Sequence, residues 1–438
     1  MRKFGLAASV GITAAMAMLL AGCGASANTS PSTTTQSSGP LTVWVDAPRV
    51  SAVKAFEKAY PNIPVKMNLI STTVTNSQLE AQIQLFNKSG SGWPDVLWFS
   101  SLSNISWAAS PTINYAANLT NLVPKSVVNG YNHDAIAACE IGGQLRCLRN
   151  DYAPTVLWYN AKLFHEWGYS PPKTWPQYEA LGLEIAKQHP GYYVGAVGDG
   201  ATYNYLWASA CPVNTLVRST TVKINLTSPN CTRMVNVLDP LIKAGVLSKS
   251  PWFSSQMDAI GSKMVMTPGP TWFGVYLYKD SFHTPAGQIT ATVPITWPGQ
   301  DITGDYGGGL WTVSSHLSGK LLQEAVKFAE FVATSPKNQV DLAPTFPAYG
   351  PDEGPWLQKN VVDSNYFADP GSIVNAFKKS VGMVWTGHPY LKFSPDQIWA
   401  TTVTPALDRG ESLQQIWPTY QKALVNYAQE YGYSVVTN

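Results

Sequence analysis

Residues 41–45, Leu41-Thr-Val-Trp-Val45, form an apolar stretch typical of a buried first strand. Apolar residues then recur at helical spacing from Val50 to Tyr60, and Pro61 ends the predicted helix. The pattern predicts a second strand over 63–69, a helix over 79–86 and a short strand over 94–99. Strand, helix, strand, helix and strand in this order indicate a parallel α/β sheet.

Similar elements are predicted along the rest of the chain. We expect strands at 156–159, 264–267 and 292–295, and helices at 175–188, at 321–332 and from about Glu411 onward. Thr174 is a plausible N-cap for the helix at 175–188. The sequence shows no internal repeat, and its 438 residues suit one large body of two lobes.

The N-terminus has the layout of a signal peptide, predicted over residues 1–22. Arg2 and Lys3 precede an uncharged apolar run from Phe4 to Leu20. No later stretch reaches the ~20 apolar residues that a membrane-spanning helix needs. An uncleaved N-terminal anchor helix is the alternative.

The apolar run ends in Leu20-Ala-Gly-Cys23, which resembles the lipobox of bacterial lipoproteins. This resemblance implies cleavage before Cys23, lipidation of its sulfur, and anchoring to the outer face of the cell membrane. A free cysteine beside an ordinary cleavage site is the alternative. Residues 24–40 are rich in Ser, Thr, Gly and Pro and have too little apolar bulk to fold, so 23–40 is predicted to be a lipidated tether.

Cysteine usage agrees with export to an oxidising compartment. The chain has five cysteines, and Cys23 accounts for the odd one. Cys139, Cys147, Cys211 and Cys231 allow three disulfide pairings, of which we favour the sequence-near pairs 139–147 and 211–231. A metal site is the weaker alternative, because no CxxC occurs and no histidine stands beside these cysteines.

Charge and motifs argue against several classes of protein. The formal net charge is +2, and removal of Arg2 and Lys3 leaves equal numbers of basic and acidic residues, without a basic run that would indicate nucleic-acid binding. No GxSxG, HExxH or P-loop motif is present, so we expect no enzyme, metal or cofactor. The paired carboxylates of a glycosidase are neighbours in space rather than in sequence, which leaves a carbohydrate-active enzyme as an alternative.

From Leu41 to the C-terminus the chain resembles extracellular solute-binding proteins of the sugar-binding, maltose-binding-protein-like group. The resemblance rests on motifs in the family's order: Leu41-Thr-Val-Trp44, Phe56-Glu-Lys-Ala-Tyr-Pro-Asn-Ile63, Pro94-Asp-Val96, Leu157-Trp-Tyr-Asn160, Pro171-Pro-Lys-Thr-Trp175, Gly269-Pro-Thr-Trp272 and Gly307-Gly-Gly309. Two departures occur. Thr271 is inserted before Trp272, and Cys147-Leu-Arg-Asn-Asp-Tyr-Ala-Pro154 replaces the usual Gly-x-Pro.

The resemblance implies a two-lobed, type II periplasmic-binding-protein-like α/β fold with a ligand cleft between the lobes. Lobe one would hold 41–151 and 295–344, and lobe two 154–293 and 349–438. The chain would cross between them near 152–155, 292–296 and 345–350. Such a protein binds a small solute, here favouring a mono- or oligosaccharide, as a monomer, and hands it to the permease of an ABC importer. A polyamine or an anion is the alternative cargo.

A sugar site needs flat aromatic rings for C–H faces and short polar groups for hydroxyls. Trp272 matches the family's cleft tryptophan, and Tyr203 and Asn204 fall where the family commonly places ligand contacts. Glycines would let the backbone approach a ligand closely. The candidate ligand residues are Trp44, Asp46, Trp98, Ser100, Tyr203, Asn204, Trp272, Gly308, Gly309 and Trp385. For each tryptophan, packing in the core is the alternative.

Overall fold

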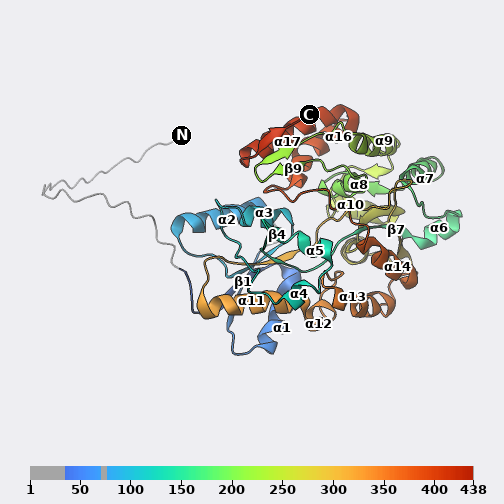
Figure 1. Ribbon diagram of the computed structural model, residues 1–438. Coiled ribbons are helices and arrows are strands. Elements are labelled where there is room, and N and C mark those ends of the chain that lie inside the picture. Colours follow the sequence, from blue (N-terminus) through green and yellow to red (C-terminus); the bar gives the residue numbers. More distant parts are fainter. Residues whose placement is uncertain (1–34, 71–75, 438) are drawn as a thin grey trace, which may run out of the picture.

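The computed structural model describes residues 35–70 and 76–437 and is drawn in Figure 1. The predicted signal peptide and Cys23 lie outside the described residues. Within the described chain, one α/β half is built around β1 and the other around β7.

The first half contains a five-stranded sheet in the order β2-β1-β3-β14-β6. As predicted, β1 (Leu41–Val45) pairs in parallel with β2 (Val65–Leu69) and with β3 (Val96–Phe99). β14 (Leu310–Val313) runs antiparallel to β3, and β6 (Leu148–Arg149) pairs with the far side of β14. Two distant parts of the chain therefore build one sheet.

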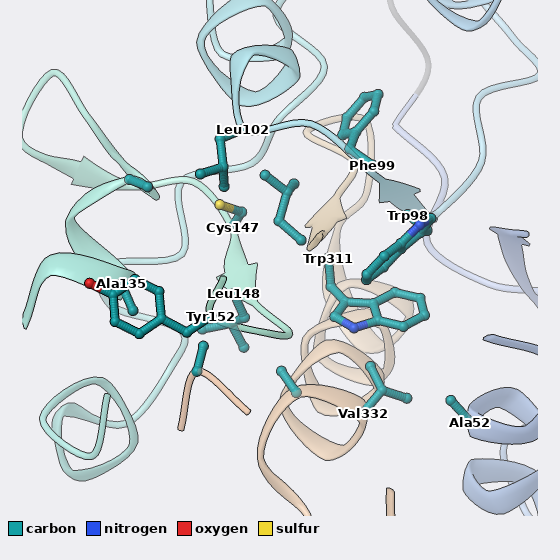
Figure 2. Close-up of a cluster of buried hydrophobic side chains, with 14 of the residues drawn as sticks. Ala52, Trp98, Phe99, Leu102, Ala135, Cys147, Leu148, Tyr152, Trp311 and Val332 are labelled. Atoms are coloured by element: carbon teal, nitrogen blue, oxygen red, sulfur yellow. The ribbon is translucent and has the colours of Figure 1, made fainter. Parts of the chain in front are cut away.

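Alternation along β1 explains how this sheet is covered. Every second side chain of β1 is fully buried, and α1 (Val50–Ala59) and α11 (Gly319–Thr334) pack together beside the sheet. Phe56 of α1 lies 4.8 Å from Phe328 of α11, measured between ring centroids. Figure 2 shows Trp98 and Trp311 of the same core, whose rings lie 5.0 Å apart.

The second half is organised by a three-stranded sheet in the order β12-β7-β13. The central strand, β7 (Thr155–Asn160), pairs antiparallel with β12 (Met266–Pro270) and β13 (Ile289–Thr292). Trp158 of β7 is wholly buried and packs on Phe377 of α14 (Pro370–Val381). The strand predicted at 292–295 was wrong in position, because β13 has ended by Thr292.

The main helices around the second half are α7 (Trp175–Gln188), α9 (Pro229–Lys243) and α17 (Leu413–Glu430), and α9 packs against both others. The predicted N-cap is confirmed, since the Thr174 hydroxyl accepts from the backbone N–H of Gln177 in a capping box.

The other described elements are shorter or lie at the periphery: α2 (Asn76–Ser89), α3 (Ser103–Ala108), α4 (Lys125–Val128), α5 (His133–Ala137), α6 (Ala161–Trp167), α8 (Tyr203–Trp207), α10 (Ser255–Ile260), α12 (Pro336–Gln339), α13 (Gly350–Leu357), α15 (Pro395–Ile398), α16 (Thr404–Asp408), β4 (Glu140–Ile141), β5 (Gln144–Leu145), β8 (Gly195–Ala196), β9 (Thr215–Arg218), β10 (Thr221–Lys223), β11 (Leu247–Ser248) and β15 (Ser434–Val436).

Three chain segments lie side by side where the two halves meet. The N–H of Thr155 donates to the carbonyl of Gly304 at 2.8 Å, and the N–H of Tyr152 donates to the carbonyl of Phe346 at 2.8 Å. The predicted crossing at 292–296 needs correction. Ile295 is buried in the core of the second half and Thr296 pairs with Thr174, so the segment beside residues 153–155 is 304–306. That segment is short and has no apolar periodicity by which to recognise it.

Two disulfides join sequence-near cysteines, Cys139 to Cys147 and Cys211 to Cys231. The first lies in the core of the first half, where Figure 2 shows Cys147 close to Leu148. The second lies in the core of the other half. Each half therefore carries one covalent cross-link.

Candidate functional site

A cavity of about 230 Å³ lies between the two halves. The first half contributes the loop after β3, and the second half contributes α8, Trp272 and the segment leading into α15. The lining residues are Ser100, Ser101, Leu102, Ser103, Tyr203, Trp207, Pro212, Asn214, Trp272, Asp305, Tyr306, Gly307, His388, Pro389, Tyr390, Ser394, Pro395 and Asp396.

Aromatic rings form much of the cavity wall. Trp272 is half-buried, and its indole N–H donates to the carbonyl of Tyr306 at 3.0 Å. Trp207 is also half-buried and stacks on His388, with ring centroids 4.0 Å apart. Both indoles therefore have a fixed orientation and retain some exposed surface.

Three of the predicted ligand residues, Ser100, Tyr203 and Trp272, line this cavity. Tyr203 is fully buried, and its hydroxyl donates to the carbonyl of Pro395 at 3.3 Å. These residues come from both halves of the molecule, as a cleft site requires.

Trp44, Asp46 and Trp98 lie outside the cavity lining, near the ends of β1 and β3. The guanidinium of Arg49 lies over the Trp98 ring at 4.0 Å and donates to Asp46 at 3.2 Å. Burial raises the pKa of Asp46, while the charge of Arg49 acts in the opposite direction. Trp44 packs edge-on against Phe86, with ring centroids 5.9 Å apart.

Gly308 and Gly309 lie outside the cavity lining. A Cβ on Gly308 would lie 2.6 Å from a guanidinium nitrogen of Arg149, and one on Gly309 would overlap the Trp98 ring. The lack of a side chain at both positions therefore makes room for Arg149 and Trp98, and a ligand contact there stays a prediction. Gly307, the first glycine of the run, is the one that lines the cavity.

Asn204 and Trp385 also lie outside the lining. Asn204 is buried, and its side-chain oxygen accepts from the Thr155 hydroxyl at 2.6 Å, which ties it to the junction of the halves. Its ligand role stays a prediction. Trp385 is half-buried, with its ring centroid 5.8 Å from that of His388.

A buried ion pair that was not predicted from the sequence lies at the base of the cavity. Arg149 and Asp305 are almost wholly buried and approach to 2.9 Å. Arg149 also donates to the carbonyls of Asp151, at 3.0 Å, and Gly307, at 3.1 Å. Burial lowers the pKa of Arg149, but the charge of Asp305 raises it, and the net shift is upward. Arg149 is therefore a permanent cation. The departure at 147–154 was the one sequence signal for this site.

A second missed group lies at the start of α15. The Tyr306 hydroxyl donates to Asp396 at 3.1 Å, and burial raises the pKa of Asp396 to about 6. Nearby, burial lowers the pKa of His388 to about 3, so this ring is neutral at physiological pH. These residues fall in a stretch of Pro, Ser and Gly turns without a recognisable motif.

A family model described as bacterial extracellular solute-binding protein matches residues 44–340, more than half of the chain. The chain belongs to this family. The resemblance seen in the sequence and the two-lobed fold that it implied are both confirmed. In this solute-binding protein, the cavity between the lobes is the candidate ligand site.

Solved structures similar to this solute-binding protein share its fold at low identity. A binding protein from B. animalis subsp. lactis Bl-04 in complex with beta-1,6-galactobiose is 20% identical, with a TM-score of 0.75 over 90% of this chain and 99% of its own. The lacto-N-biose-bound protein of Bifidobacterium longum is 19% identical, with a TM-score of 0.76 over 91% and 99%. The GacH receptor of Streptomyces glaucescens GLA.O is 18% identical, with a TM-score of 0.68 over 90% and 100%. No curated protein matches the sequence.

Two features are absent from residues 35–70 and 76–437. No described helix has the length and apolar character needed to cross a membrane. In the same part of the chain, no three His, Cys, Asp or Glu side chains are grouped so that they could hold a metal ion.

Proposed function

We propose that this protein binds a mono- or oligosaccharide in the cavity between its lobes and delivers it to the permease of an ABC importer. The observation that carries this proposal is the composition of the cavity wall. The half-buried rings of Trp207 and Trp272 share one cavity with short polar side chains such as Ser100 and Asn214. Rings can stack on the C–H faces of a sugar while the polar groups meet its hydroxyls.

The structural neighbours support a sugar as the ligand class. Two were solved with beta-1,6-galactobiose and lacto-N-biose, and the third was studied in complex with acarbose. Because these proteins are at most 20% identical to this chain, the likeness shows the fold alone. The sugar ligand therefore remains part of the proposal.

We further propose binding without catalysis. A glycosidase needs two carboxyl groups free to act as acid and nucleophile or base. Two carboxylates, Asp305 and Asp396, do line the cavity, but Asp305 is held by Arg149 and by the backbone N–H of Ala153 at 3.2 Å. Both Asp305 oxygens accept hydrogen bonds from these donors, so this carboxylate is not free to act as the nucleophile or base. A bound sugar should therefore be released unchanged.

We also propose a signal peptide, a lipid anchor at Cys23 and a tether. The extracytoplasmic location and the monomeric state are likewise proposals. The contacts of Gln36, near the end of the predicted tether, limit how far the tether could extend from the folded protein. Gln36 bridges to the first lobe, donating to the carbonyl of His316 at 2.9 Å and accepting from the N–H of Ser318 at 3.0 Å. Any free tether would thus end before Gln36, and the lobe that contains α11 would face the anchor.

The proposed lobe boundaries follow the three segments that run side by side. We propose that lobe one ends near Asp151, resumes near Tyr306 and ends again near Thr345. Ligand binding would close the lobes about these segments. Small-angle scattering should then show a smaller radius of gyration at saturating sugar than without it.

A ligand screen tests the proposed function. Thermal shift with neutral mono- and disaccharides, amino sugars, uronates, polyamines and inorganic anions should identify sugars that raise the melting temperature. Isothermal titration and chromatography of the recovered ligand then give the affinity and show whether the sugar is intact. Stabilisation by polyamines or anions alone would contradict the proposal, and recovery of cleaved sugar would show an enzyme.

A further inference from the structure

The charges around the cavity do not balance. Its ionisable lining groups, apart from tyrosines, are Asp305, His388 and Asp396. Asp305 is neutralised by Arg149, and His388 is neutral because burial lowers its pKa to about 3. Asp396 therefore gives the cavity one uncompensated negative charge at neutral pH.

The surroundings of Asp396 contain no compensating cation. No lysine or arginine of the described residues pairs with it, and its partner Tyr306 is a neutral phenol. The nearest other acid, Asp199, repels it, although both Asp199 oxygens are occupied by the backbone N–H groups of Ala201, at 2.9 Å, and Trp252, at 2.8 Å. Tyr203, on the neighbouring helix α8, donates to the carbonyl of Pro395 and not to the carboxylate.

The space for this carboxylate is created by a neighbouring glycine. A Cβ on Gly200 would overlap the side chain of Asp396. An ionised carboxylate offers about four acceptor sites. Tyr306 and a contact with Ser394 leave that capacity partly unused, and the half-buried side chain keeps part of its surface toward the cavity. A ligand that brings hydroxyl donors would supply the missing hydrogen bonds.

We propose that Asp396 determines the specificity of the cavity: it accepts hydrogen bonds from ligand hydroxyls, admits neutral sugars and excludes acidic sugars such as uronates. This inference rests on the proposed function. Hydroxyl groups that donate to a carboxylate make charge-assisted hydrogen bonds, which are about twice as strong as neutral ones. A uronate would instead bring a second negative charge beside Asp396 in a cavity whose lining residues include no lysine or arginine, which is strongly unfavourable.

The test compares each neutral sugar that binds with its uronate counterpart, for example galactose with galacturonate and glucose with glucuronate, by isothermal titration at pH 7.5. We expect the wild-type protein to bind the neutral member at least ~100-fold more tightly. Asp396→Asn should weaken neutral-sugar binding by ~10- to 100-fold and shrink the discrimination to under ~10-fold. Asp408→Asn, which changes an exposed acid of α16 in the same half, is the matched control and should alter neither value.

A pH series adds a readout that needs no variant. Because sugar hydroxyls favour the ionised form of Asp396, the affinity should be highest above pH 6 and fall as Asp396 becomes protonated below it. The burial-raised pKa of Asp199 is also about 6, so only the part of the pH dependence that Asp396→Asn abolishes belongs to Asp396. Tyr306→Phe keeps the carboxylate and should keep the discrimination against uronates.

The outcomes separate this inference from the proposed function. Equal wild-type binding of a neutral sugar and its uronate, or undiminished discrimination in a folded Asp396→Asn protein, would overturn the inference and leave sugar binding intact. If only amine-bearing ligands bind, the ligand of Asp396 is a cation rather than a neutral sugar, and the inference is overturned. If no sugar of any kind binds, the proposed function fails and the inference fails with it.

Discussion

Replacement of Trp272 by alanine separates a ligand platform from ordinary packing. The ring has three kinds of contact in the ligand-free protein. Its N–H donates to the carbonyl of Tyr306 at 3.0 Å, its edge meets Phe273 at 4.8 Å between centroids, and one face lies near Phe253 at 6.0 Å. Because the residue is half-buried, the remaining surface faces the cavity and is available to a sugar.

These contacts set the expected magnitudes for Trp272→Ala. Full burial of a tryptophan would make its loss cost ~3–5 kcal/mol of stability, and the half-buried position should reduce this to ~1–3 kcal/mol. Loss of a stacked ring face from the ligand should cost ~2–3 kcal/mol, counting the aromatic contact and the buried area. That corresponds to an affinity about 30- to 150-fold weaker, at ~1.4 kcal/mol per tenfold change.

The assay is a melting curve of the ligand-free variant combined with isothermal titration of the sugar found by the screen. Trp272→Phe is the matched control, since it keeps an aromatic face but loses the hydrogen bond to Tyr306, and should retain most of the affinity. Normal affinity with a lower melting temperature would refute the reasoning, because it would make Trp272 a packing residue. Unchanged values for both would place the ligand elsewhere.

Four further predictions follow from the structure. Arg149→Met should lower the free energy of unfolding by ~3–5 kcal/mol, because it leaves Asp305 buried and unpaired, and a smaller loss in the Arg149→Met, Asp305→Asn double variant would show in denaturant titrations that the pair is responsible. Replacing Cys139 and Cys147 by serine should cost up to ~3 kcal/mol, seen as an earlier midpoint in urea, whereas an unchanged midpoint would argue against the bond. Because burial holds the folded pKa of His388 near 3, below its unfolded value of about 6.5, its neutral form contributes stability above pH 6.5 that is lost as the pH falls towards 3; His388→Gln should flatten this part of the stability profile. Mass spectrometry of the exported protein under non-reducing conditions should find no free thiol and a lipid on Cys23, and four free thiols would contradict the assignment to an oxidising compartment.

The sequence was informative where periodicity and local chemistry decide the structure. The apolar stretch from Leu41 to Val45 predicted β1, and Thr174 predicted the start of α7. The family resemblance was also informative for Trp272, which comes two residues after Pro270 and lines the cavity. The prediction of a strand at 292–295 was wrong because an apolar residue such as Ile295 can be buried without pairing in a sheet.

The residues that sequence reasoning could not place depend on contacts between distant segments. Asp305 and Arg149 are 156 positions apart, and Tyr306 meets Asp396 across 90 positions. Neither pair has a spacing that would reveal it, because a buried acid looks like any exposed acid until its partner is known. Glycines mislead for the same reason: a glycine run indicates close approach, but not whether a ligand, Arg149 or Trp98 approaches.

The junction of the lobes and the floor of the cavity share residues, and this links binding to closure. Asp305 lines the cavity and lies in the segment that runs beside residues 153–155, while Arg149 bonds Asp305 and the carbonyl of Gly307, another lining residue. A ligand that contacts Asp305 or Gly307 therefore acts directly on a segment that joins the lobes. Because a ligand shifts a conformational equilibrium only through its differential affinity for the two states, contacts at Asp305 and Gly307 are well placed to favour the closed one. The Arg149–Asp305 ion pair would hold this segment in place, so that the lobes could rotate about it while the site keeps its shape.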